Sequence, residues 1–412
     1  MNEELYNFLL GKIFYFCQLP SYTKWGIWSF EPDGKIKGMH SDFEQTWKIE
    51  NERLLILDSQ GHVTCIFEGQ IEKMQKSHLL RPGMEHFQVA LIATDLIGYD
   101  YFDSLCPIEN DLVAACMETG SVANEKLRQL LLEDKTIDGY YAGRAYAVKR
   151  KNLEIGLKQY KGVFYDLELS QNQPDFFTKK LLVWFPGLLS YNHGNARENF
   201  FPNPFEGITG SIAKNTVVLR IADSNLINGS YYLNTPNFGD YEQNIQELIA
   251  KTAKEEGILR ENILCAGSSR GGMGALYHGL LGNYALVSMD PVVDRSPWLQ
   301  SADVQLMFDC IPVSFVDKLN QLLENLSAEK IQVITSPQVP ITYPFIIQLK
   351  TWKLALKTYR MKLTDEQFDY QPYGGKMHGD FVNRNIPLLL MKINEFLYGC
   401  DSIENTIDEK TL

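Results

Sequence analysis

Cysteine and histidine are scarce in this sequence, and neither is clustered. The seven cysteines are scattered over 412 residues with no Cys-x-x-Cys pair. This spacing excludes a zinc ribbon and a thioredoxin-like redox motif, and it is typical of reduced thiols, so we expect a cytoplasmic protein. The seven histidines form no His-Glu-x-x-His and no pair at helical spacing, and no EF-hand loop occurs. We therefore expect no metal site.

Positive charge is also in short supply. The sequence has 39 Lys and Arg against 51 Asp and Glu, a net charge of −12. Such a surface repels phosphate backbones and anionic membranes, so neither is an expected partner. The apolar stretch 5–19 is interrupted by Asn7 and Lys12 and is too short for a membrane span, so it predicts a packed helix or strand. The N-terminus lacks the features of a secretory signal, and no P-loop or dinucleotide-binding glycine pattern occurs.

The sequence does contain enough apolar residues for large cores. Hydrophobic residues make up 45% and charged residues 22% of the chain, which predicts a globular protein of two or three domains at this length. Within residues 1–150, short β patterns separated by Asp, Asn and Gly turns predict a small antiparallel β meander, either an open sheet or a partial barrel. They lie at 25–30, 47–50, 54–57 and 63–67. The tryptophans 25, 28 and 47 are predicted to fill its core, and exposed rings that bind glycan or a partner are the alternative.

The pattern changes within residues 151–400. Continuous apolar runs alternate there with helical spacing, such as that of residues 241–256. Buried strands alternating with helices predict an α/β fold, with a mostly parallel sheet flanked by helices. The apolar runs lie at 180–185, 216–222, 262–266, 285–289 and 331–335. We place the domain boundary near residue 150 and assign 401–412 to an acidic C-terminal tail.

One segment carries a chemical signature. Residues 267–271 read Gly-Ser-Ser-Arg-Gly, which fits G-x-S-x-G between a strand and a helix. A serine on so sharp a turn needs glycine two residues to either side, because other side chains would collide. This register selects Ser269, since Ser268 would need glycine where Ala266 stands. A glycine-rich turn that binds phosphate, or no ligand, is the alternative interpretation.

The block 267–277 resembles the nucleophile elbow of the α/β-hydrolase fold, and the resemblance extends over about residues 160–400. It is most similar to bacterial capsular-polysaccharide biosynthesis proteins and to accessory-secretion proteins that resemble glycan O-acetyltransferases. The resemblance implies a serine esterase or O-acyltransferase that forms an acyl-enzyme and acts on acetyl groups of a surface or capsular glycan. The expected partner is a carbohydrate or an acylated small molecule. No cofactor is expected, although a transferase would need an acyl donor such as acetyl-CoA.

In this fold the chain order is serine, acid, histidine, so the general base should follow Ser269. Only His278 and His378 do so. His278 is nine residues on, within the predicted helix, and should point away from the serine. His378 is predicted to lie in a glycine-flanked loop after a strand at 368–373. There a neutral imidazole can take the serine proton, so His378 is the predicted base.

The acid is harder to assign, because no carboxylate follows the predicted strand 331–335. Asp290, at the end of the preceding strand, is the first choice, and Asp294 in the same loop is the second. Asp290 could equally be a turn former before proline. A Ser–His dyad without an acid stays open, as do the carboxylates of Asp303, Asp309 and Asp317.

The oxyanion hole needs two N–H donors. We expect them from the backbone of Arg270, directly after the serine, and of Leu188, in the loop after strand 180–185. His193 in that loop is a candidate substrate-binding residue or a polar surface residue. The Arg270 guanidinium could bind an anionic substrate or pair with a structural carboxylate.

Two other functions fit the same sequence. The missing acid after 331–335 favours a non-catalytic scaffold in a capsule or secretion assembly, whereas the presence of both Ser269 and His378 favours an enzyme. A peptidase of the same fold is the third interpretation. The choice between esterase and transferase and the oligomeric state stay open at this level.

Overall fold

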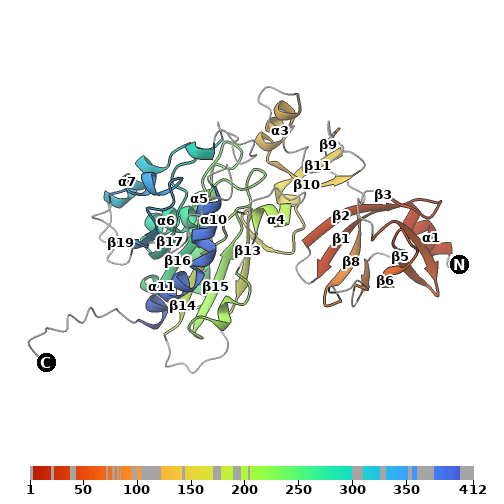
Figure 1. The fold of residues 1–412 in the computed structure, drawn as a ribbon, viewed down its shortest axis with the longest axis horizontal. Helices are drawn as coiled ribbons and strands as arrows, with labels where there is room; N and C mark the ends of the chain where they lie inside the picture. The colour runs from red at the N-terminus through yellow and green to blue at the C-terminus, as the bar shows by residue number, and fades with distance from the viewer. Residues whose placement is uncertain are drawn as a thin grey trace, which may run out of the picture.

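The structure is a computed structural model, and three β-sheets organise it (Figure 1). The residues it describes are 3–19, 23–37, 43–70, 73–76, 79–80, 83, 85–94, 100–103, 122–141, 144–169, 178–188, 196–202, 205–298, 310–324, 331–350, 355–359 and 375–399. Figure 1 shows an antiparallel sheet at one end, a small sheet in the middle and a large sheet at the other end.

The first sheet is an antiparallel meander that closes on itself. Its strand order is β3-β2-β1-β8-β7-β6-β5-β4. The two outer strands also meet, because Ile36 N donates to Gln45 O at 3.0 Å and Trp47 N donates to Gly34 O at 2.8 Å. The result is an eight-stranded up-and-down barrel. Its strands are β1 (Ile13–Leu19), β2 (Thr23–Phe30), β3 (Ile36–Lys37), β4 (Thr46–Glu50), β5 (Arg53–Leu57), β6 (Val63–Gln70), β7 (Lys73–Lys76) and β8 (Gln88–Thr94).

Large aromatic side chains fill the barrel. Trp28 and Phe16 are fully buried and stack with their ring centroids 4.2 Å apart. Trp47 is also buried in this core, and Leu5 and Leu9 of helix α1 (Glu3–Leu10) complete it. The predicted meander is present, and Trp28 and Trp47 are core residues as expected. The side chain of Trp25 lies outside the described residues.

The second sheet is small and packs with the third. It contains β10 (Lys135–Tyr141), β11 (Arg144–Lys149) and β9 (Asp100–Asp103) in that order. Leu131 of helix α3 (Val122–Leu132) and Ile137 of β10 belong to the same buried cluster as one face of the large sheet. The outer face of the barrel also has buried side chains, at Tyr15 and Ile27, and β2 contacts β10.

The large sheet has the predicted mostly parallel arrangement. Its order is β12-β13-β15-β14-β16-β17-β18-β19. The first two strands run antiparallel to their neighbours, and all later pairs are parallel. The strands are β12 (Lys158–Tyr160), β13 (Val163–Glu168), β14 (Lys180–Phe185), β15 (Thr216–Ile221), β16 (Ile263–Ser268), β17 (Ala285–Met289), β18 (Ile331–Thr335) and β19 (Ala355–Thr358). The five apolar runs of the sequence are therefore β14 to β18.

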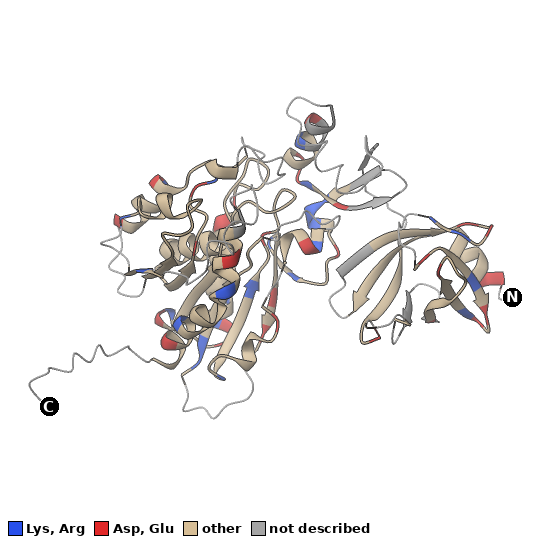
Figure 2. Ribbon diagram, in the orientation of Figure 1, with Lys and Arg blue, Asp and Glu red and all other residues tan. Residues whose placement is uncertain are grey.

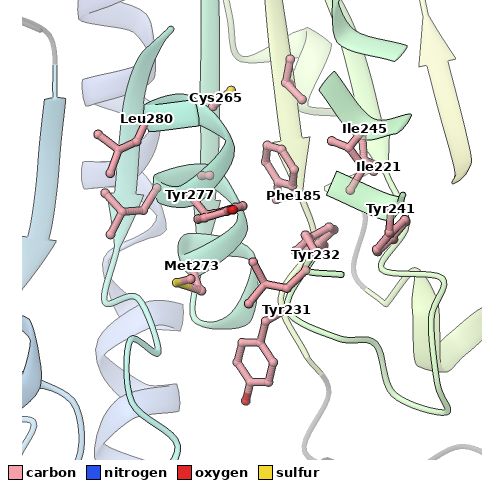
Figure 3. Close-up of a cluster of buried hydrophobic side chains, with 14 of the residues drawn as sticks. Phe185, Ile221, Tyr231, Tyr232, Tyr241, Ile245, Cys265, Met273, Tyr277 and Leu280 are labelled. Carbon is pink, nitrogen blue, oxygen red and sulfur yellow. The ribbon is translucent and has the colours of Figure 1, made fainter. Parts of the chain in front are cut away.

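Helices cover both faces of this sheet because alternate strand residues point to opposite sides. Val183 and Phe185 pack with helices α5 (Tyr241–Glu255), α6 (Arg270–Gly282) and α7 (Val316–Glu324). Leu182 and Trp184 pack with α10 (Gly375–Arg384) and α11 (Ile386–Tyr398). Figure 3 shows part of the first layer, with Phe185 facing Tyr232 and Met273 on α6. The shorter helices are α4 (Ala196–Phe200), α8 (Tyr343–Ile346), η1 (Arg150–Asn152), η2 (Ile208–Gly210), η3 (Arg260–Asn262) and η4 (Ser296–Trp298).

Charged residues of both signs lie side by side near one edge of this sheet, on its second and third strands. Figure 2 shows basic and acidic positions together on β13 and β15, where Arg220 bonds to Asp166 at 2.9 Å and to Glu168 at 2.8 Å. Within the described part of the chain, no helix is long and apolar enough to cross a membrane.

Candidate active site

Ser269 occupies the sharp turn between β16 and α6. Its φ of 57° and ψ of −123° lie in a region that residues other than glycine rarely adopt. Three backbone hydrogen bonds hold this conformation: Ser269 N donates to Met289 O at 3.0 Å, and Ser269 O accepts from Met273 N at 3.0 Å and from Val292 N at 3.2 Å. The strand, turn and helix required by the sequence motif are all present.

Glycine is needed at the positions around Ser269 because a side chain there would collide with neighbouring backbone atoms. A Cβ on Gly267 would overlap the carbonyl of Gly271, and a Cβ on Gly271 would overlap the carbonyl of Phe185. A Cβ on Gly272 would lie 2.9 Å from Met289 O, so helix α6 could not approach β17 as closely. The motif therefore fixes the serine through backbone packing on both flanks.

Three side chains meet at this turn. His378 Nε2 lies 2.7 Å from Ser269 Oγ, and His378 Nδ1 lies 2.6 Å from Asp290 Oδ2. Asp290 is fully buried, and His378 is 8% exposed. A carboxylate can only accept, so Nδ1 carries the proton and Nε2 is left to accept the serine hydroxyl proton. The structure thus brings together the three residues that the sequence selected.

His378 stands on a different element from the one expected. The sequence predicted a glycine-flanked loop, whereas the structure places His378 in the first turn of helix α10. This helix packs Phe381 and Val382 on the sheet, and that burial outweighs the poor helix propensity of Gly379. The predicted strand 368–373 lies outside the described residues.

Asp290 directly follows β17 and is held by two threonines that the sequence reasoning missed. Thr335 Oγ1 donates to Asp290 Oδ1 at 2.7 Å. Thr342 Oγ1 lies 3.0 Å from Oδ1 and 2.9 Å from Oδ2. Thr335 ends β18, the strand after which an acid was expected and not found. The sequence signal for this arrangement was a threonine at the end of β18 together with a carboxylate at the end of the preceding strand.

The other candidate acids are placed elsewhere or are not described. The carboxylate of Asp294 accepts from Ser296 N at 2.8 Å, which closes a local turn. Asp317 lies in the first turn of α7. Asp303 and Asp309 lie outside the described residues, as does His193. Among the described residues, no group of three or more His, Cys, Asp or Glu could hold a metal ion.

His278 points away from the serine, as expected, and is fully buried. Its Nε2 lies 2.9 Å from Tyr232 O, and its Nδ1 lies 3.0 Å from Gln246 Nε2. Burial lowers the pKa of His278 to about 4, so the ring is neutral near pH 7. With Nε2–H donating to the carbonyl and Nδ1 accepting from the amide, His278 is a packing residue.

The Arg270 side chain was expected either to bind an anionic substrate or to pair with a structural carboxylate, and the structure shows the pairing. The guanidinium is 1% exposed and lies 3.5 Å from the carboxylate of Asp223, Nε to Oδ2. It also donates to Gly187 O at 2.7 Å. Arg270 therefore does not offer its charge to a substrate, because its side chain is sealed inside the fold. Leu188, the other expected oxyanion residue, directly follows Gly187.

The chain was also compared with known proteins. No family model matches it, and no curated protein sequence matches it. Solved structures similar to it include a ferulic acid esterase, 13% identical, which covers 56% of this chain and 93% of its own with a TM-score of 0.34. The capsule O-acetyltransferase of Neisseria meningitidis serogroup A is 15% identical over 57% of this chain and 96% of its own, with a TM-score of 0.36. The Glycosylation Associate Protein (Gap123) complex from Streptococcus agalactiae is 14% identical over 92% of this chain and 60% of that chain, with a TM-score of 0.37. At these TM-scores the likenesses carry no functional weight.

Proposed function

We propose that this chain is a serine-dependent esterase or acyltransferase of the α/β-hydrolase type. One observation carries the proposal: Ser269 Oγ, the His378 ring and the Asp290 carboxylate form a continuous chain of contacts of 2.7 and 2.6 Å. A nucleophile, a base within hydrogen-bond reach and a group that orients the base are the parts that acyl transfer requires. A non-catalytic scaffold has no use for this alignment.

The reaction follows from these positions. Ser269 Oγ attacks the acyl carbonyl while His378 Nε2 takes its proton, and the carbonyl electrons move onto oxygen. Collapse of this intermediate expels the alcohol, which receives the proton from His378, and leaves the acyl group on Ser269. Water or an acceptor hydroxyl then removes the acyl group by the same steps in reverse. Asp290 keeps the imidazole oriented and stabilises its positive charge. The N–H groups of Arg270 and Leu188 bind the oxyanion.

For the substrate, we propose an acetyl ester on a carbohydrate hydroxyl. The support is the resemblance of the block 267–277 to capsule and glycan acyl enzymes. If the chain is a transferase, an acyl donor such as acetyl-CoA supplies the acetyl group. Incubation with acetylated oligosaccharides tests hydrolysis through release of acetate. Incubation with radiolabelled acetyl-CoA and deacetylated oligosaccharides tests transfer.

The activated serine is tested directly with a fluorophosphonate probe. We expect one adduct on the wild-type protein, because His378 raises the nucleophilicity of Ser269. Intact-mass spectrometry measures it. The adduct should be absent from Ser269→Ala and at least about 100-fold slower in His378→Ala.

Ser268→Ala is the matched control, since it removes the neighbouring hydroxyl of the same turn. Labelling of this variant at the wild-type rate is expected. Folded wild-type protein that forms no adduct, or an adduct that persists in Ser269→Ala, would contradict the proposal.

A further inference from the structure

Two successive carbonyl groups after β14 are held from inside the protein. Pro186 O accepts from the Tyr232 hydroxyl at 2.7 Å, and Gly187 O accepts from Arg270 Nη2 at 2.7 Å. Both donors are buried, with Arg270 1% exposed and Tyr232 fully enclosed. Figure 3 shows Tyr232 beside Phe185, and the two rings meet edge to face with their centroids 4.9 Å apart. The peptide units around Gly187 are thus anchored toward the core.

This anchoring decides where the next N–H points. A trans peptide unit is planar, so the N–H of Leu188 lies opposite to the C=O of Gly187. With the carbonyl fixed on Arg270, the N–H of Leu188 is turned away from the guanidinium. Gly187 also borders the nucleophile, because a Cβ built on it would lie 3.9 Å from Ser269 Cβ. Gly187 thus lies beside Ser269, and the N–H of Leu188 leaves this peptide on the side away from Arg270.

The guanidinium is itself fixed by Asp223. This carboxylate is fully buried and accepts at Oδ1 from Ser230 N at 3.0 Å and from Tyr232 N at 3.2 Å. Burial raises the pKa of Asp223, and the adjacent Arg270 opposes that rise. Asn228 O, the second acceptor beside Gly187 O, also bonds to the guanidinium. Asp223 thus positions both anchors, Arg270 through its charge and Tyr232 through its backbone.

We propose that Arg270 is a positioning residue for the oxyanion hole: its side chain, with Tyr232, aligns the peptide whose N–H at Leu188 receives the developing negative charge. Its own backbone N–H is the other donor, so one residue determines both halves of the hole. This inference rests on the proposed serine mechanism. It assigns Arg270 and Asp223, a buried ion pair, to the alignment of a catalytic loop.

The test is Arg270→Lys, which keeps a positive charge for Asp223 and removes the planar fork. Hydrolysis of p-nitrophenyl acetate and binding of an aryl trifluoromethyl ketone are measured. The ketone bonds to Ser269 Oγ and its oxygen becomes the oxyanion, while the serine proton passes to His378. We expect kcat/KM and ketone affinity to fall together by about 100-fold, the loss typical of one oxyanion donor. Affinity for the matching trifluoromethyl alcohol, which has no oxyanion, should stay at the wild-type level.

Two further variants make the result specific. Arg220→Lys is the matched control, because Arg220 is 3% exposed and paired with two carboxylates on the edge of the sheet; we expect wild-type kcat/KM. Tyr232→Phe deletes the other anchor by removing one hydroxyl, and should lower ketone affinity about fivefold. If Arg270→Lys does not fold, the ketone affinity of Tyr232→Phe tests the positioning role by itself.

The outcomes separate this inference from the proposed function. Wild-type protein that neither labels with fluorophosphonate nor hydrolyses the ester contradicts the function itself. An active wild type with folded Arg270→Lys and Tyr232→Phe variants that bind the ketone normally overturns the positioning role alone. Equal losses of affinity for ketone and alcohol overturn it too, because they indicate a general disturbance of the site.

Discussion

At the scale of single residues, Asp290 shows how the fold accommodates a buried negative charge. The carboxylate is inaccessible to water and meets the hydroxyls of Thr335 and Thr342 and the imidazole of His378. Hydrogen bonds to an ionised group are stronger than those between neutral groups and offset the cost of removing the charge from water. The two threonines thus hold the carboxylate in the direction of His378.

Thr342→Val tests this arrangement, because it preserves shape and removes the hydroxyl. We expect kcat/KM to fall about tenfold, the usual consequence of losing one hydrogen bond to a charged group. Steady-state hydrolysis of p-nitrophenyl acetate measures this loss.

Thr216→Val is the control for this variant. Thr216 is 2% exposed on β15, and its hydroxyl has no hydrogen-bond partner among the described residues. It should leave kcat/KM unchanged. A wild-type kcat/KM for folded Thr342→Val would contradict the role of Thr342 in holding Asp290.

At the scale of elements, helix α6 joins the catalytic turn to a neutral histidine. His278 is buried with a pKa lowered to about 4, whereas it titrates near 6.5 in the unfolded chain. Between these values only the unfolded chain takes up the proton. The stability contributed by the neutral ring is therefore complete above pH 6.5 and is lost as the pH falls toward 4.

The corresponding prediction compares wild type with His278→Gln in urea unfolding at pH 6.5 and 5.0. Glutamine keeps a donor and an acceptor but has no such titration. The wild type should lose about 1 to 2 kcal/mol more than the variant over this interval. Equal losses would show that His278 is protonated inside the folded protein.

The elements also show what sequence can predict. Strands β14 to β18 could be predicted from their apolar runs, because a strand that is buried on both faces consists of consecutive hydrophobic residues. Ser269 followed from glycine spacing and His378 from chain order. Thr335 was marked only by its place at the end of β18, and Thr342 could not be predicted, since a hydroxyl that donates to a distant carboxylate leaves no local pattern. The helix at His378 was missed because its stability comes from the contacts of Phe381 and Val382 with the sheet.

At the scale of the whole molecule, the barrel and the large sheet have separate cores. The barrel cluster around Trp28 shares no residue with the two clusters that cover the large sheet. The sequence allowed a partial barrel, but its full closure was not predicted, because the pairing of β3 with β4 and of β1 with β8 depends on tertiary contacts. Separate cores predict separate unfolding transitions.

Trp28→Ala tests this separation by calorimetry. The substitution empties the centre of the barrel and should destabilise it by about 4 kcal/mol. We expect one transition to move to lower temperature, while the other transition and the labelling rate of Ser269 stay unchanged. A single transition that moves as a whole would mean that the two cores unfold together.

The pairing of β1 with β8 has a consequence for the architecture of the chain. Ile13, where the barrel begins, is the direct partner of Thr94, where it ends. The chain therefore enters and leaves the barrel at adjacent points, and all eight strands find their neighbours within it. Removal of this unit as a block would therefore leave every strand of the large sheet with its neighbours.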